Sequence, residues 1–155
     1  MKFDEKRYAK LFEWKKLIPS VQELSLQETK DFRAAWRKKF IGPDAKVAGI
    51  PLHKCHACGT GKLYFDWHYF SYNVYIASTN FIEKIVKMSN MDERVVVFPD
   101  KCDMLALMMR LGDLIEHLKV DPYVGTDLYV TPKKMEWTLV FTHEDDFGPY
   151  FVKAV

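Results

Sequence analysis

Two cysteines and the histidines near them are the residues of this chain that most resemble a metal site. Cys55 and Cys58 have the Cys-x-x-Cys spacing that lets two thiolates bind one tetrahedral zinc ion from a tight loop. A complete site needs two further ligands, and the sequence has no second pair with this spacing. Only Cys102 or a histidine such as His53 or His56 is available to complete it. The spacing therefore favours a loop with two reduced cysteines and no cofactor, with zinc binding as the alternative.

A second group with possible chemistry is a histidine followed by three carboxylates, at residues 143–146. A histidine beside a carboxylate can act as a general base or as a metal ligand, so His143 and Glu144 are the candidate catalytic residues. The pair lacks the i, i+4 histidines of a zinc protease, and Thr-His-Glu can equally order a turn by hydrogen bonding. The sequence also lacks a glycine-rich phosphate loop, a nucleophile elbow and a kinase signature. We therefore predict no catalytic residue, with a small hydrolase as the alternative.

Aromatic residues crowd the segment 63–77, which directly follows the cysteine loop. Their density, together with β-branched neighbours, is typical of sheet. Tyrosine and tryptophan dominate the energetic centres of protein interfaces. Four of these residues are therefore candidate contacts for a protein partner: Tyr64, Trp67, Tyr69 and Tyr75.

Charge gives little support to nucleic-acid binding. The chain has 23 Lys and Arg against 21 Asp and Glu, a net charge of +2, so no excess of positive charge favours a polyanion. One local basic cluster lies on the second predicted helix: Lys30, Arg33, Arg37, Lys38 and Lys39. Such a cluster can meet an acidic partner or a phosphate backbone, but a charged outer helix face is usually only solvated.

Length and composition indicate a globular protein. A chain of 155 residues with 48% apolar residues fits one domain with a sizeable core. The N-terminus lacks a secretory signal, and no apolar run is long enough to cross a bilayer, so we expect a cytoplasmic protein that does not contact a membrane. Three cysteines without an export signal argue against a disulfide framework.

Hydrophobic periodicity predicts the elements that must hold these side chains. Two helices are expected within residues 1–42, the second opening with a capping box formed by Ser25 and Glu28. A short helix is expected to begin after Asn80, and a longer one to span residues 100–119. Strands are expected at residues 95–98, 127–131, 135–143 and 150–155, the last two as neighbours. The prediction is a single α+β domain over residues 1–155, with a helical part at 1–42 and a mixed β-sheet with packed helices at 60–155.

Two segments resemble a family of small uncharacterised bacterial proteins. The first, Asp66 to Tyr72, resembles a Trp-His-x-Phe-Ser-Tyr segment. The second runs from Asp127 through Trp-Thr-Leu-Val-Phe-Thr-His-Glu at residues 137–144 to Gly-Pro-Tyr-Phe at residues 148–151, and it resembles that family's C-terminal signature. Proteins of this size and type are often immunity proteins of toxin systems. The resemblance therefore implies a non-enzymatic interaction protein that binds and neutralises a partner toxin.

Overall fold

The computed structural model describes most of the chain. The described residues are 8–41, 46–47, 50–51, 75–77, 81–99, 104–121, 124, 126–141 and 150–153. The helices are α2 (Ala9–Leu17), α3 (Leu26–Phe40), α4 (Phe81–Met88) and α5 (Leu111–Val120). The strands are β1 (Gln22–Glu23), β2 (Lys46–Val47), β3 (Ile50–Pro51), β4 (Tyr75–Ala77), β5 (Arg94–Pro99), β6 (Leu107–Arg110), β7 (Leu128–Pro132), β8 (Trp137–Phe141) and β9 (Tyr150–Lys153).

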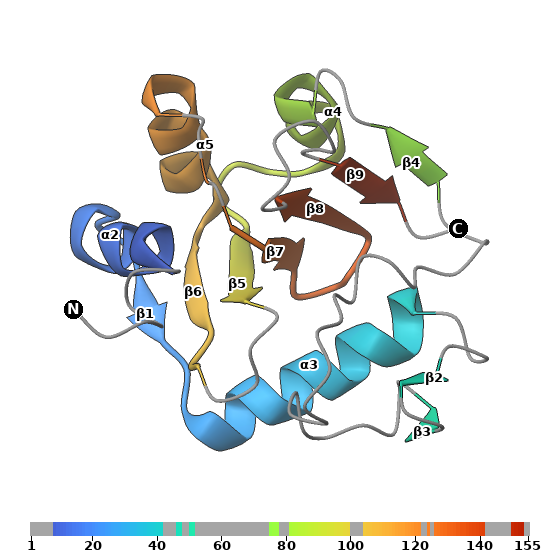
Figure 1. The fold of residues 1–155 in the computed structure, drawn as a ribbon. Helices are drawn as coiled ribbons and strands as arrows, with labels where there is room; N and C mark the ends of the chain where they lie inside the picture. Colours follow the sequence, from blue (N-terminus) through green and yellow to red (C-terminus); the bar gives the residue numbers. More distant parts are fainter. Residues whose placement is uncertain are drawn as a thin grey trace.

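Seven strands form one antiparallel sheet in the order β1-β6-β5-β7-β8-β9-β4, and β2 and β3 form a separate hairpin-like pair (Figure 1). The predicted pairing of the last two strands is confirmed, since Val140 of β8 lies opposite Tyr150 of β9. The sheet was expected to be mixed, but every pairing among the described strands is antiparallel. The strand β1, which lies between the first two helices in the sequence, pairs with β6 and so joins the sheet.

Helices cover both faces of this sheet, which confirms the α+β class. Helices α2, α4 and α5 lie on one face and α3 lies on the other (Figure 1). Alternate residues of β8 enter the two resulting cores: Trp137 and Leu139 pack with α2 and α5, whereas Val140 packs with α3. All five residues of β8 are buried, so both faces of the sheet are covered at this strand.

Helix α3 begins at the predicted capping box. The Ser25 hydroxyl accepts a hydrogen bond from the Glu28 amide, and the Glu28 carboxylate accepts one from the Ser25 amide, both at 3.1 Å. Further along the helix, Trp36 is fully buried and its Nε1 donates to Thr138 Oγ1 at 2.8 Å. This bond joins the C-terminal half of α3 to β8.

The predicted solvated basic face of α3 is wrong for two of its arginines. Arg33 and Arg37 are only 5% and 3% exposed. The Arg33 guanidinium lies 5.8 Å from the centre of the Phe98 ring and donates to the Pro99 carbonyl. Because α3 lies across the sheet, its buried face is wide enough to include these residues beside the aromatic stripe. Lys30, Lys38 and Lys39 are exposed as expected.

The helix predicted at residues 100–119 is wrong in its first half. Residues 107–110 form β6, and the helix α5 begins only at Leu111. Within β6, Leu107 and Met109 are buried while Met108 and Arg110 are partly exposed, which is the alternation of a strand. The apolar spacing of these residues fits the period of a helix as well as that of a strand. They form a strand because they pair with β5, which is buried on both faces.

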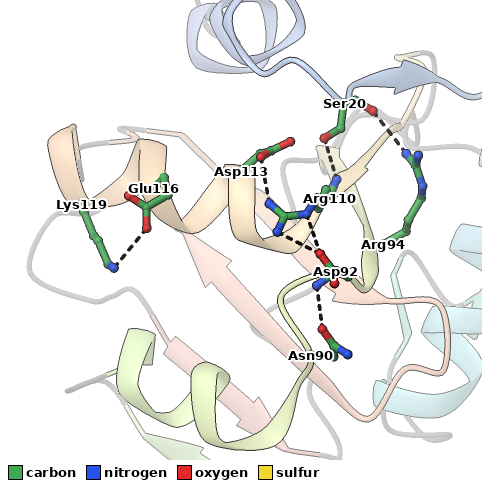
Figure 2. A network of polar contacts seen from close by, with 8 residues as sticks. All are labelled: Ser20, Asn90, Asp92, Arg94, Arg110, Asp113, Glu116 and Lys119. Atoms are coloured by element: carbon green, nitrogen blue, oxygen red, sulfur yellow. Dashed lines mark hydrogen bonds and ion pairs between the residues drawn. The ribbon is translucent and has the colours of Figure 1, made fainter.

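A polar network holds the junction between β6 and α5 (Figure 2). The Arg110 guanidinium binds Asp92 at 2.9 Å and Asp113 at 3.0 Å. The Arg110 amide donates to Ser20 Oγ at 2.9 Å, and Arg94 donates to the Ser20 carbonyl at 3.2 Å. These bonds fix the chain that enters β1 to the strands beside it.

No helix within the described residues is long and apolar enough to span a membrane.

Candidate functional site

Almost all of the sequence-predicted site residues lie outside the described part of the chain. These are His53, Cys55, His56, Cys58, Tyr64, Trp67, Tyr69, Cys102, His143 and Glu144. Tyr75 belongs to β4, the strand at one edge of the sheet, where it lies opposite Lys153 of β9. Zinc binding by the cysteines and catalysis by the histidine and glutamate therefore stay predictions.

The described residues bring together a different group of polar side chains, between α2 and the end of α5. The Lys10 ammonium binds the Asp121 carboxylate, and it lies 3.2 Å from the Glu13 carboxylate. His117 Nε2 lies 3.9 Å from Glu13 Oε1, and the His117 ring meets Trp14 edge-on, with 6.3 Å between ring centres. Residues more than a hundred positions apart in the sequence therefore form one cluster.

Lys10 lies between the two carboxylates of this cluster. Its side chain is only 9% exposed, and this burial lowers its pKa. Hydrogen bonds to Asp121 and Glu13, with the charges of both carboxylates, outweigh that effect and hold the pKa of Lys10 above its ordinary value. The ammonium is therefore charged throughout the physiological range and ties α2 to α5.

Three members of the cluster have the chemistry of metal ligands. One ligand atom each from Glu13, His117 and Asp121 can be chosen so that all three lie within 4.8 Å of one another. His117 Nε2 is buried, with no hydrogen-bond partner among the described residues. However, the Lys10 ammonium already binds both carboxylates, so a metal ion would have to displace a buried cation. The arrangement works as an ionic connection between two helices.

The other side of α2 borders an open apolar groove of about 210 Å³. Its lining residues come from α2, β1, β6 and the residues before β6: Leu11, Phe12, Lys15, Glu23, Met104, Leu105 and Leu107. The two charged members bind each other, with 2.6 Å between Lys15 Nζ and Glu23 Oε2. Phe12 is 37% exposed, one of the few large apolar side chains that the described residues leave at the surface. The groove thus offers an apolar surface whose bordering charges cancel.

Sequence reasoning missed both features for the same reason. Helical spacing reveals the pairs Lys10–Glu13 and His117–Asp121, but nothing in the sequence shows that these pairs meet. The groove depends on β1, whose two residues are too few to produce a hydrophobic pattern. Contacts between residues about a hundred positions apart were needed to find them.

These features define an α+β protein with an antiparallel sheet between helices, which presents an apolar groove at the end of the sheet. The chain belongs to the family described as a domain of unknown function (DUF4275), whose profile matches residues 16–151. The matched region begins in α2 and ends in β9, so it includes strands from both edges of the sheet. No curated protein and no solved structure matches the chain.

Proposed function

We propose that this chain is a non-enzymatic cytoplasmic protein that binds another protein, most specifically an immunity protein that neutralises a bacterial toxin. The observation that carries the proposal is the apolar groove beside the exposed Phe12. An apolar patch that stays open at the surface of a folded domain often marks an interaction site. Immunity against a toxin is the finer part of the proposal, and the resemblance of residues 66–151 supports it.

The arrangement of charges favours binding over catalysis. Catalytic groups are typically placed in a cleft with perturbed pKa values and a free approach for substrate. The ionisable groups that gather between α2 and α5 instead bind one another through Lys10. The groove likewise has only Lys15 and Glu23 as charged lining residues, and these are paired.

Total charge restricts the class of toxin. An inhibitor of a basic nuclease would be expected to present an acidic surface, because complementary potentials speed and select such encounters. The net charge of +2 does not provide one. The proposed partner is therefore a toxin whose contact surface is largely apolar.

Co-expression with the product of the adjacent gene tests the proposal. Cells that make this chain should survive expression of that product, and the two proteins should co-elute in size-exclusion chromatography. A Phe12→Ser variant should weaken the complex, whereas Leu26→Ser, which removes an even more exposed leucine from α3, should not. The absence of both protection and a complex with the wild-type chain would refute the proposal.

The zinc alternative is tested in the same preparation. Stoichiometric zinc by elemental analysis, with unfolding at lower temperature after chelation, would favour a metal-dependent module, since structural zinc contributes directly to folding.

A further inference from the structure

We propose that the free edge of β1 and the adjoining groove bind an extended, uncharged segment of the partner protein. The segment would pair with β1 as an additional strand and place one apolar side chain in the groove. This inference rests on the proposed function and specifies the surface and the chemistry of the contact. Strand addition to an open sheet edge is a common mode of peptide recognition, in which main-chain bonds give affinity and side-chain pockets give specificity.

The register of β1 determines which of its backbone groups are available. The Leu24 amide donates to the Ala106 carbonyl at 2.9 Å, and Gln22 lies opposite Met108. In an antiparallel pair, residues alternate between those that bond to the neighbouring strand and those that point away. Leu24 and Gln22 therefore face β6, and the intervening Glu23 directs its N–H and C=O outward.

No described strand lies beyond β1, so these two groups form an open edge. β1 is the last strand of the sheet next to α2 (Figure 1). The side chains of Gln22 and Glu23 are both exposed. One donor and one acceptor on the same residue are what an extended chain needs to add a strand by a pair of hydrogen bonds.

The groove lies on the face of the sheet that such a strand would reach with its side chain. Glu23 points to the α2 face, because it binds Lys15 of α2. A residue paired with Glu23 places its side chain on that same face, where the groove opens. The volume of about 210 Å³ is below the roughly 300–1,000 Å³ of small-molecule sites, which suits a side chain better than a cofactor.

The charges that border the groove determine which kind of segment can bind there. The ion pair between Lys15 and Glu23 leaves no net charge at the groove, so a charged side chain would lose hydration without gaining a partner. A second copy of this chain fits poorly, because antiparallel pairing of two β1 strands through Glu23 would place two glutamates opposite each other. A neutral segment of a different protein meets both conditions.

Contacts within the domain fix the position of β1 in the absence of a partner. Ser20 receives hydrogen bonds from the Arg110 amide and from Arg94 (Figure 2), and Val21 packs against the core. These contacts fix the two residues that precede β1. A preformed edge reduces the entropy lost on binding and so favours affinity.

The test compares two substitutions at one position. Glu23→Pro and Glu23→Ala both remove the carboxylate that borders the groove and pairs with Lys15, but only Glu23→Pro also removes the outward N–H. Neither substitution breaks a backbone bond to β6. The probe is a short capped peptide that alternates threonine and leucine, titrated into the ¹⁵N-labelled full chain. We expect shifts at groove residues and at Glu23, and binding about tenfold weaker for Glu23→Pro than for Glu23→Ala.

A second arm does not depend on how well the proline variant folds. The same peptide, N-methylated at its central residue, should lose binding to the wild-type chain, because the methyl group removes a donor to the strand edge. The inference is overturned if millimolar peptide causes no shifts at the groove, or if N-methylation and Glu23→Pro leave binding unchanged. Self-association of the wild type that Glu23→Pro abolishes would overturn the choice of a different protein as partner.

The complex with the adjacent gene product separates this inference from the proposed function. If that complex forms equally well with the wild type and Glu23→Pro, the edge is not the contact, although the chain is an interaction protein. If no complex forms, the proposed function fails, and the peptide titration still decides whether the edge binds an extended chain.

Discussion

Replacement of Lys10 by methionine should destabilise the protein by about 1–2 kcal/mol at neutral pH. Methionine keeps most of the aliphatic packing and removes the charge, so the loss reports on the ionic connection between α2 and α5. Removing one partner of a buried pair costs about 3–5 kcal/mol, whereas an exposed pair contributes about 0–1 kcal/mol. Lys10 is 9% exposed, but Asp121 and Glu13 are 44% and 37% exposed, so solvent screening places this case between the two limits.

The pH dependence gives a second and stricter measurement. The pKa of Lys10 is raised in the folded state, so its contribution is complete below the unfolded pKa of about 10.4 and is lost as the pH rises through the folded value. The stability difference between wild type and Lys10→Met should be constant from pH 7 to about 10 and should shrink above it. Urea unfolding followed by tryptophan fluorescence measures both quantities.

A matched control is Lys16→Met, which removes an exposed charge from the same helix. This variant should change stability by less than about 0.5 kcal/mol. Equal stability of Lys10→Met and wild type at pH 7, or a difference that persists unchanged at pH 11, would refute the assignment of Lys10 as a charged connection between the helices.

Three further comparisons of variants test other parts of the fold. Thr138→Val leaves the buried Trp36 N–H without its Thr138 acceptor and should lower the free energy of unfolding by about 1–3 kcal/mol, measured by chemical unfolding. The double variant Thr138→Val/Trp36→Phe should be less destabilised than the sum of the two single variants. Hydrogen bonds from the backbone and side chain of Ser25 lower the pKa of Glu28 in the folded state. The stability that the Glu28 carboxylate contributes is therefore present above about pH 4.3 and is lost as the pH falls through the folded pKa. The melting temperatures of Glu28→Gln and wild type should converge in acid. Arg33→Ala should cost about 1.5–3 kcal/mol and Lys38→Ala less than about 0.5 kcal/mol in the same assay, and equal effects would contradict the burial of Arg33.

The elements that sequence reasoning predicted well are those in which local chemistry and burial agree. The capping box at Ser25 and Glu28 starts α3, because its hydrogen bonds involve residues only three positions apart. The strand β5 was predicted because its uniformly apolar run indicates a strand buried on both faces, and β8 was predicted because its apolar residues recur at every second position. In these places the sequence contains the whole reason for the structure.

The predictions that failed are those in which a distant partner decides. Residues 107–110 carry spacing that suits a helix, yet they pair with β5, and that choice depends on the other strands of the sheet. The two buried arginines of α3 follow from how the helix lies across the sheet, which periodicity alone does not give. The cluster of Lys10, Glu13 and His117 requires α2 and α5 to meet, and it therefore appears only in three dimensions.

A sheet covered on both faces leaves only its two edges for recognition of a partner's backbone. Among the described strands, β1 and β4 are those edges, and seven strands at about 4.8 Å spacing place them about 29 Å apart. One added strand cannot pair with both. A partner that depends on Glu23 in β1 should therefore tolerate a substitution at Tyr75 in β4, and a partner that depends on Tyr75 should tolerate Glu23→Pro. The two substitutions thus distinguish the edge indicated by the structure from the aromatic surface predicted by the sequence.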